Sequence, residues 1–350
     1  MTGPQVRLRK AGAGKGENMP QEKKMIRWGI TGTGKIADIY ANMIRSLPDM
    51  EVSGVAARDA AKTERFRSVH DIRKAYASLE DMIADGQIDC VFVGTPHSVH
   101  KEQVKQLIDA GIPVLCTKPM SLSLEDVKGL FDYAAEKNVM LWESMWHLFK
   151  PTMLKARQLL EDGTVGTVLK TEIHCSFIAE FDPENRLFNK ALGGGSLLDV
   201  GIYGVSVCHF LMRQKPVGIK AAARIGSTGC DEIMEILLQY PDGVLAYLES
   251  GIIDEDRQEM RIVGTEGTLF IDDFWYADHL TIRRRDGSEE AVVTEDHTET
   301  WTSERHDYQL MQFADCVRDT SKRQEIWSAE KSIEVHEIMR KAFGQAGISY

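Results

Sequence analysis

The chain has 350 residues, a hydrophobic fraction of 43%, a charged fraction of 27% and a net charge of −11 at pH 7. This length exceeds what one hydrophobic core usually holds, so we expect two domains. The excess of acidic residues argues against nucleic acid as a partner, because a phosphate backbone is bound mainly by clustered Lys and Arg. No run approaches the roughly 18 apolar residues that a membrane-spanning helix needs. We therefore expect a small-molecule partner, no nucleic acid and no membrane.

The cysteines and the N-terminal segment indicate the compartment. The six cysteines are scattered and form no CxxC pair, and no secretory signal with an apolar core precedes the first predicted strand. Reduced thiols in the cytoplasm are the simplest interpretation. Residues 1–24 are polar and basic and show neither helical nor strand periodicity, so we predict a disordered extension there.

From Ile26 onward, apolar strands alternate with amphipathic helices. The pattern predicts strands over residues 26–31, 51–57, 75–76, 90–93, 113–116 and 140–143, and helices over 35–47, 60–69, 99–110 and 124–137. Such an alternation is typical of right-handed βαβ units around a parallel sheet. We therefore predict an α/β Rossmann domain with a doubly wound parallel sheet over residues 25–148.

The remaining residues, 149–350, show a different pattern. After a helix over 152–160, strands are predicted over residues 168–177, 218–225, 233–240, 244–251, 258–263 and 268–271. Strands that follow one another without helices predict an α+β domain with a large, mainly antiparallel sheet. Helices over 197–210, 303–319 and 328–343 are expected to cover one face of this open-faced sheet, and the last is also a candidate to pack back on the Rossmann domain. The other face is expected to form a homodimer.

A G-x-G-x-x-A motif stands where the first strand ends and the first helix begins. Gly32 permits a tight turn, Gly34 lets backbone N–H groups approach a pyrophosphate, and Ala37 keeps the helix close to the sheet. The helix N-terminus favours the bound anion. The motif predicts a dinucleotide site, in which Thr33, Lys35 and Ile36 belong to the same turn.

The end of the second strand bears on the choice of dinucleotide. An acid there usually binds the adenine ribose of NAD, whereas an arginine suits the 2′-phosphate of NADP. Here Arg58 follows the strand, and Lys62 adds a cation one helical turn later. These residues favour NADP. NAD stays an alternative because Asp59 offers a ribose acceptor, and a solvated helix start is the alternative role for Arg58 and Lys62.

Three residues carry the predicted chemistry. Lys118 follows a strand of the first domain, and Asp199 and Tyr203 are four residues apart on a predicted helix, so the latter two share a face. Oxidation of an alcohol by hydride transfer needs a group that takes the hydroxyl proton. A free phenol has a pKa of about 10, but a neighbouring ammonium favours the phenolate. We therefore assign proton transfer to Tyr203 and Lys118, with Asp199 orienting Lys118 or the substrate; a helix cap or salt bridge is the alternative role for Asp199.

These motifs together resemble a known family. The segments GTGKIA at residues 32–37, VGTPHSVH at 93–100, TKP at 117–119 and GGGSLLDVGIY at 193–203 look like the Gfo/Idh/MocA oxidoreductases. WESMW at 142–146 and TGCDE at 228–232 are most similar to the NADP-dependent dimeric dihydrodiol and D-xylose dehydrogenase branch. The resemblance implies dimerisation through the open sheet, lysine and tyrosine as proton-transfer residues, and polyols as common substrates.

The resemblance also assigns further residues, with one departure. It places Thr95, Pro96, His97 and His100 along the nicotinamide side of the cleft. Where the family usually has E-K-P this chain has Thr117 before Lys118, which puts the geometry beside the nicotinamide ribose in question. We expect the substrate space to be lined by Trp146, His147, Phe149, Arg186 and Asn189. Packing at the domain junction is the alternative role for Trp146, His147 and Phe149.

These inferences lead to one function with two alternatives. We expect an NADP-dependent oxidoreductase that transfers a hydride between nicotinamide and a hydroxyl carbon of a sugar, polyol or cyclic diol. A regulatory protein that senses NADP or a sugar is one alternative, motivated by Thr117, and an NAD-dependent glycoside hydrolase is another. His97 and His100 form an H-x-x-H, but no further ligands are spaced to complete a metal site, so no metal is expected.

Overall fold

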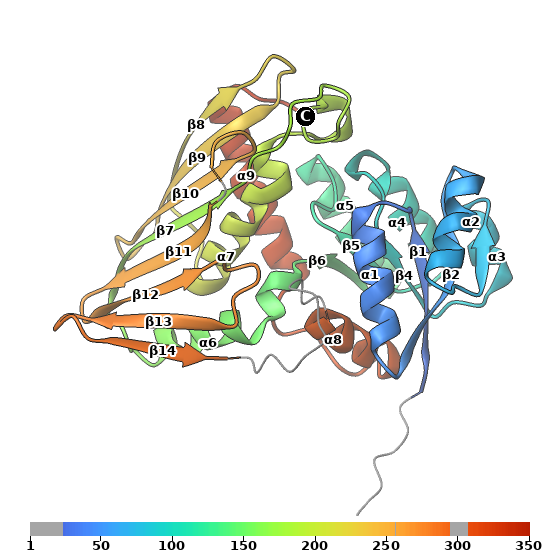
Figure 1. The fold of residues 1–350 in the computed structure, drawn as a ribbon, viewed down its shortest axis with the longest axis horizontal. Helices are drawn as coiled ribbons and strands as arrows, with labels where there is room; N and C mark the ends of the chain where they lie inside the picture. Colours follow the sequence, from blue (N-terminus) through green and yellow to red (C-terminus); the bar gives the residue numbers. More distant parts are fainter. Residues whose placement is uncertain (1–23, 256, 295–306) are drawn as a thin grey trace, which may run out of the picture.

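The computed structural model describes residues 24–255, 257–294 and 307–350, and it has two sheets, each with its own helices (Figure 1). The predicted extension lies almost entirely outside the described residues, as does the start of the predicted 303–319 helix. The predicted domain boundary at residue 148 falls in a short 3-10 helix, η2 (Trp146–Phe149), between the last strand of the first sheet and the first helix of the second part.

The first sheet has six parallel strands in the order β3-β2-β1-β4-β5-β6. Its strands are β1 (Ile26–Thr31), β2 (Met50–Ala56), β3 (Lys74–Tyr76), β4 (Cys90–Val93), β5 (Val114–Thr117) and β6 (Leu141–Ser144). Four of them are apolar runs buried along most of their length, as expected when helices cover both faces of a parallel sheet. The order reverses between β1 and β4, and a crevice for ligands forms at such a switch point. The predicted Rossmann domain is confirmed.

Five helices connect the strands of this sheet in turn: α1 (Lys35–Ser46), α2 (Ala60–Val69), α3 (Leu79–Asp85), α4 (His100–Asp109) and α5 (Leu124–Glu136). Three begin at side-chain caps, because Asp59, Ser78 and Ser123 each accept a hydrogen bond from a backbone N–H in the first turn. Helix α1 instead begins at Gly34 without a side-chain cap. Its first N–H groups therefore remain available to a ligand.

The second sheet has eight strands in the order β14-β13-β12-β11-β7-β10-β9-β8. They are β7 (Val168–Ser176), β8 (Gly218–Ile225), β9 (Asp231–Gln239), β10 (Leu245–Gly251), β11 (Arg257–Gly264), β12 (Gly267–Asp272), β13 (His279–Arg284) and β14 (Glu289–Val293). Only β7 and β10 pair in parallel, so the mainly antiparallel sheet is confirmed. The edge hairpin β13–β14 was not predicted, because arginine and glutamate side chains such as Arg283 and Glu289 obscure its strand pattern.

The later helices divide between the two sheets. Helices α6 (Pro151–Glu161) and α7 (Ile202–Met212) pack on the second sheet, and α9 (Ala329–Ala346) contacts both domains (Figure 1). Helix α8 (Asp307–Arg318) was predicted to cover the second sheet, and that prediction is wrong. It packs on α1 and β1 of the Rossmann domain, where the Phe313 ring lies 5.2 Å from that of Trp28.

The segment Lys190–Met212, which contains α7, has the length and composition of a membrane span, with a mean hydropathy of 1.4 in its most apolar 18-residue window. However, 83% of that window is buried inside the protein. Helix α7 is apolar on nearly every side because it packs between the sheet and α9. Core packing therefore accounts for its composition.

Candidate active site

The turn after β1 has the geometry that the glycine motif predicts. Gly32 has φ +91°, and a Cβ there would lie 2.9 Å from the Gly94 carbonyl oxygen, so the fold itself requires this glycine. Gly34 differs, because its φ of −84° suits any residue and a Cβ would meet no protein atom within 4 Å. Its missing side chain leaves open space in front of the α1 N-terminus. This is the space that a pyrophosphate needs.

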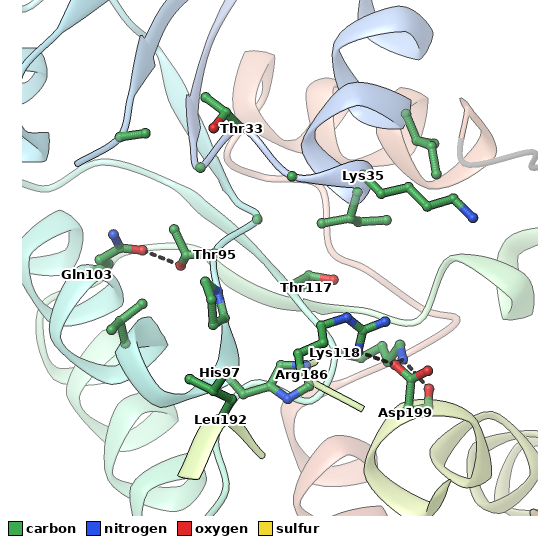
Figure 2. Close-up of a pocket in the computed structure, with 18 of the residues that line it drawn as sticks. Thr33, Lys35, Thr95, His97, Gln103, Thr117, Lys118, Arg186, Leu192 and Asp199 are labelled. Atoms are coloured by element: carbon green, nitrogen blue, oxygen red, sulfur yellow. Dashed lines mark hydrogen bonds and ion pairs between the residues drawn. The ribbon is translucent and has the colours of Figure 1, made fainter. Parts of the chain in front are cut away.

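A cavity of about 650 Å³ extends from this turn to the junction of the two domains. Of the residues expected in the site, those on its wall are Gly32, Thr33, Gly34, Lys35, Ile36, Arg58, Lys62, Thr95, Pro96, His97, Thr117, Lys118, Trp146, Arg186, Asp199 and Tyr203. Figure 2 shows the phosphate turn at one end and Lys118, Arg186 and Asp199 at the other. A single cavity therefore joins the predicted cofactor turn to the predicted chemical residues.

Near the end of β2 the wall carries two cations and one acid. Asp59 caps α2, accepting a hydrogen bond from the Lys62 backbone N–H at 3.0 Å, and it lies 3.9 Å from the Lys62 ammonium. Among the residues that the structure describes, the Arg58 side chain makes no hydrogen bond or ion pair. Asp59 is thus already paired at the start of α2, while the Arg58 guanidinium is available to an anion.

Lys118 and Tyr203 converge from different domains. The Lys118 ammonium nitrogen lies 4.6 Å from the centroid of the Tyr203 ring. It also donates a hydrogen bond to the backbone oxygen of Asp199 and lies 3.6 Å from that residue's carboxylate Oδ1. The Trp146 indole N–H donates to the Tyr203 hydroxyl at 3.2 Å. The predicted pairing of ammonium and phenol is therefore present in the fold.

Two cations share the single carboxylate at this end. Arg186 donates from Nη1 to the same Asp199 Oδ1 at 2.8 Å, as Figure 2 shows. Burial would raise the pKa of Asp199, but Lys118 and Arg186 outweigh it and lower that pKa to about 2. Burial and Arg186 lower the pKa of Lys118 below its usual value, with Asp199 opposing them. The carboxylate is thus ionised at neutral pH, and the ammonium loses its proton more readily than a solvated lysine.

The segment that positions Asp199 and Tyr203 departs from a regular helix. Residues Leu197–Gly201 form a single π-helical turn, η4, that leads into α7. Such turns are rare and occur frequently at functional sites. Before the turn, Gly195 has φ +116°, and a Cβ there would lie 2.3 Å from Asp231 Oδ1. A side chain at this position would therefore displace the start of the turn that carries Asp199.

We expect Gly195→Ala to destabilise the protein by about 2 kcal/mol or more, because it adds both backbone strain and overpacking. Gly129→Ala is the matched control: Gly129 lies in α5 with no atom within 4 Å of its virtual Cβ, so this change should stabilise by up to about 1 kcal/mol. Denaturant unfolding of both variants measures the difference. Equal unfolding midpoints would contradict the close packing described for Gly195.

Four residues expected at the cleft do not lie on its wall. His100 is fully buried and bridges the carbonyl oxygens of Thr95 and Pro119 at 2.7 and 3.2 Å. His147 bonds to Ser206 behind the Tyr203 ring, because its place in η2 directs it into the core. Phe149 points toward Trp142, and Asn189 caps a 3-10 turn through the Ala191 N–H. The expectation that these four side chains line the cleft is therefore wrong.

His97 does lie on the wall, close to Lys118 and Asp199 (Figure 2). Burial, the neighbouring His100 and the Lys118 ammonium hold the pKa of His97 well below its usual range. The imidazole is therefore neutral at pH 7. Its Nδ1 is buried without a hydrogen-bond partner among the described residues.

Thr117, at the end of β5, lies on the wall next to Lys118, where the resembled family usually has an acid. A neutral hydroxyl here removes one negative charge from beside the ammonium. The acids left on the wall among the described residues are Asp59 and Asp199, set against the cations Lys35, Arg58, Lys62, Lys118 and Arg186. In a chain of net charge −11, this cavity is a local concentration of positive charge suited to a polyanionic ligand.

Sequence reasoning missed several wall residues, including Gln103, Trp275 and Tyr276. The Gln103 side-chain oxygen accepts hydrogen bonds from Thr31 at 3.2 Å and Thr95 at 2.7 Å, and so joins the ends of β1 and β4. The Trp275 ring lies 5.3 Å from that of Tyr203. Gln103 and Trp275 belong to no motif. The position of Gln103 one turn into α4 nevertheless places it at the carboxyl ends of the strands.

Within residues 24–255, 257–294 and 307–350, no group of three or more His, Cys, Asp or Glu side chains is arranged to hold a metal ion. His97 and His100 lie edge to face with ring centroids 5.6 Å apart, and both ring nitrogens of His100 face backbone carbonyl oxygens.

Comparison with known proteins identifies the family. Residues 26–145 match the model described as the oxidoreductase family with an NAD-binding Rossmann fold, and residues 153–270 match the GFO/IDH/MocA C-terminal domain. The chain belongs to the Gfo/Idh/MocA oxidoreductases. It is an NAD(P)-dependent dehydrogenase or reductase, as the glycine turn and the cavity indicate.

Curated Gfo/Idh/MocA relatives cover most of the chain. Trans-1,2-dihydrobenzene-1,2-diol dehydrogenase from Xenopus laevis is 31% identical over 328 residues, which is 93% of this chain and 99% of the relative. The Mus musculus enzyme of the same name is 35% identical over 260 residues, 73% of this chain and 78% of the relative. The predicted similarity to the dihydrodiol dehydrogenase branch is therefore confirmed.

Solved structures share the fold at lower identity. Aldose-aldose oxidoreductase from Caulobacter crescentus, complexed with glycerol, has a TM-score of 0.82 at 20% identity and covers 93% of this chain and 98% of its own. A 3-ketoreductase from Actinomadura kijaniata with NADP and TDP-benzene has a TM-score of 0.82 at 21% identity, covering 92% and 98%. At these identities the likeness establishes the fold alone.

Proposed function

We propose that the protein is an NADP-dependent dehydrogenase that transfers a hydride between nicotinamide and a hydroxyl carbon of a sugar, polyol or cyclic diol. The observation that carries the proposal is the convergence of the Lys118 ammonium on the Tyr203 ring, at 4.6 Å, in the cavity that also contains the glycine turn. The names of the curated relatives, which are diol dehydrogenases, support the substrate class.

The wall residues fit a nicotinamide dinucleotide. The open space at Gly34 and the uncapped α1 N-terminus suit the pyrophosphate, and Arg58 with Lys62 suits a 2′-phosphate. Thr95, Pro96 and His97, which the family resemblance assigns to the nicotinamide side of the cleft, are also on the wall. When bound, the nicotinamide supplies the acceptor or donor of a hydride.

Proton transfer is the role of this chain's own residues. In the oxidation direction Tyr203 takes the proton of the substrate hydroxyl, and the nearby Lys118 ammonium stabilises the phenolate that carries the negative charge. The Trp146 N–H donates to the same phenolic oxygen and so orients it. Asp199 holds Lys118 through its backbone oxygen and its carboxylate. Trp146 and Trp275 lie on the wall with less than a tenth of their surface exposed, and they add apolar contact for a sugar or diol ring.

We expect Arg58→Gln to raise the KM for NADP about 10- to 100-fold and to leave the KM for NAD nearly unchanged, because a paired charge-assisted contact to the 2′-phosphate is lost. Arg65→Gln is the matched control, since Arg65 lies on α2, the helix that follows Arg58, is exposed and does not line the cavity. Steady-state kinetics with both cofactors gives the comparison. Equal changes for NADP and NAD would contradict a 2′-phosphate contact.

We also propose a cytoplasmic homodimer that assembles through the outer face of the second sheet and has neither nucleic-acid nor membrane partners. The support is a mixed face with exposed Leu169, Leu237 and Leu245 next to charged side chains such as Glu172 and Arg261. All six cysteines are free and buried, which suits a reducing compartment. A light-scattering mass of one chain would contradict the dimer, and recovery in a membrane fraction would contradict the location.

Substrate panels test the proposed function. Purified protein with NADP or NAD should form reduced nicotinamide, detected by absorbance, with an aldose such as xylose or with a cyclic diol. Cofactor binding without turnover on any substrate would favour a regulatory protein instead. Copurified nicotinamide with product formation and no net reduction would favour a glycoside hydrolase.

A further inference from the structure

Helix α9 joins the two halves of the site. It packs on α5 and β6 of the Rossmann domain and on α7 and β8 of the second domain, and Figure 1 shows it running from the β8 edge toward β6. Lys118 belongs to the first of these domains and Tyr203 to the second. Any element that fixes one domain against the other therefore also fixes the distance between their side chains.

The first link from α9 reaches the loop that carries Lys118. His336 Nε2 lies 2.9 Å from Glu143 Oε1 on β6, and the same oxygen accepts the Met120 backbone N–H at 2.8 Å. Glu143 and Met120 are buried, and the His336 side chain is 5% exposed. Burial would raise the pKa of Glu143, but His336, Ser332 and the Met120 N–H outweigh it, so the carboxyl stays ionised. A buried carboxylate thus ties α9 to a position two residues beyond Lys118.

The second link reaches the loop that leads to Asp199 and Tyr203. After α9 ends, the Tyr350 hydroxyl donates a hydrogen bond to the Gly194 backbone oxygen and lies 3.3 Å from Asp231 Oδ1. The other oxygen of Asp231 accepts the Leu197 backbone N–H at 2.7 Å, at the first residue of η4. The close approach of Gly195 to Asp231 and Tyr350 completes this contact.

We infer that these two links form an interdomain clamp, in which His336 and Tyr350 are positioning residues that set the separation of Lys118 from Tyr203. The inference rests on the proposed function, because it assigns the clamp to the same proton-transfer pair. The His336–Glu143 link is buried and the Tyr350 link is partly buried, so loss of either leaves a polar group with reduced access to water unpaired and is costly. A displacement of about 1 Å in an oriented catalytic group costs about 100-fold in rate.

Exposed ion pairs on α9 serve as a contrast. Arg340 pairs with Glu125 of α5 at 2.7 Å, with side chains 56% and 71% exposed. This pair also joins α9 to the Rossmann domain, but it lies in solvent and contacts neither catalytic loop. Such pairs contribute little to stability. Arg340→Gln is therefore the matched control for loss of a clamp contact.

The experiment compares His336→Leu, His336→Gln, Tyr350→Phe and Arg340→Gln by amide hydrogen exchange, kcat and NADP dissociation constant. Exchange needs no substrate, so it tests the clamp even if the wild type turns over none of the panel. In that event only the proposed function fails. Tyr350→Phe removes a single oxygen and keeps the test available if His336→Leu does not fold.

The clamp predicts local and distinct responses. His336→Leu should speed exchange at residues 117–122 about 10-fold or more, and Tyr350→Phe should do so at residues 193–199. Each of these two variants should lower kcat about 10-fold or more, while its NADP dissociation constant stays within about twofold of the wild type. His336→Gln keeps a hydrogen-bond donor and should recover most of the rate. Unchanged exchange in these segments, or an equal loss of kcat in Arg340→Gln, would overturn the inference.

Discussion

Tyr203→Phe is expected to lower kcat about 10²- to 10⁴-fold, because it removes the hydroxyl assigned to exchange a proton with the substrate oxygen beside Lys118. The phenyl ring keeps its packing against His147 and Trp275, at centroid distances of 4.7 and 5.3 Å. The dissociation constant for NADP should therefore stay within about twofold. Steady-state turnover and a cofactor-binding titration on the same preparation measure both effects.

Tyr247→Phe is the control for this change. Tyr247 lies on β10, away from the cavity wall, so its hydroxyl has no part in the proposed chemistry. Undiminished turnover in Tyr203→Phe would refute the assigned role. A loss in both variants would indicate a general effect of removing a tyrosine hydroxyl.

Lys118→Met is expected to lower kcat about 10²- to 10³-fold, because the phenolate of Tyr203 loses the cation that stabilises it. Arginine should restore only part of the rate, since a guanidinium keeps the positive charge beside the phenolate but stays protonated and cannot take part in the proton transfer assigned to Tyr203 and Lys118. The fold should tolerate the methionine, because Asp199 keeps its partner Arg186 at 2.8 Å. The measurement is kcat for Lys118→Met and Lys118→Arg, together with their thermal midpoints.

The outcome separates charge from proton transfer. If Lys118→Arg were as active as the wild type, Lys118 would act only as a fixed positive charge. If Lys118→Met retained full turnover, the lysine would have no role in the chemistry. A matched loss of thermal stability and kcat would point to unfolding instead. Lys128→Met, at a partly buried ion pair with Glu337 away from the cavity wall, controls for removal of a lysine.

The Rossmann fold could be predicted because its strands are apolar runs separated by amphipathic helices. β4 has the sequence CVFV and is fully buried. A short, continuous apolar run between two helices is typical of a strand buried on both faces of a parallel sheet. The packing partner of α8 could not be predicted in the same way. Its apolar face indicates that it is buried against something, but the contact of Phe313 with Trp28 depends on the three-dimensional fold.

The candidate site shows the same division. Residues within contiguous motifs, such as Gly32, Lys118 and Asp199, lie on the cavity wall as expected. Trp275 reaches the wall from the segment after β12, and no local pattern marks it. His147 and Phe149 were misplaced because residues close together on a 3-10 turn point in different directions, and those two point into the core.

Deuterium transfer tests the central claim most directly. A diol or aldose that the wild type oxidises would be prepared with deuterium on the carbon that bears the reacting hydroxyl. The mass of the reduced cofactor would then be measured by mass spectrometry. Direct hydride transfer predicts one deuterium in each NADPH formed. The rate of oxidation of the labelled substrate should be lower in Tyr203→Phe than in the wild type. NADPH without the label, or an oxidised substrate with no reduced cofactor, would contradict the account.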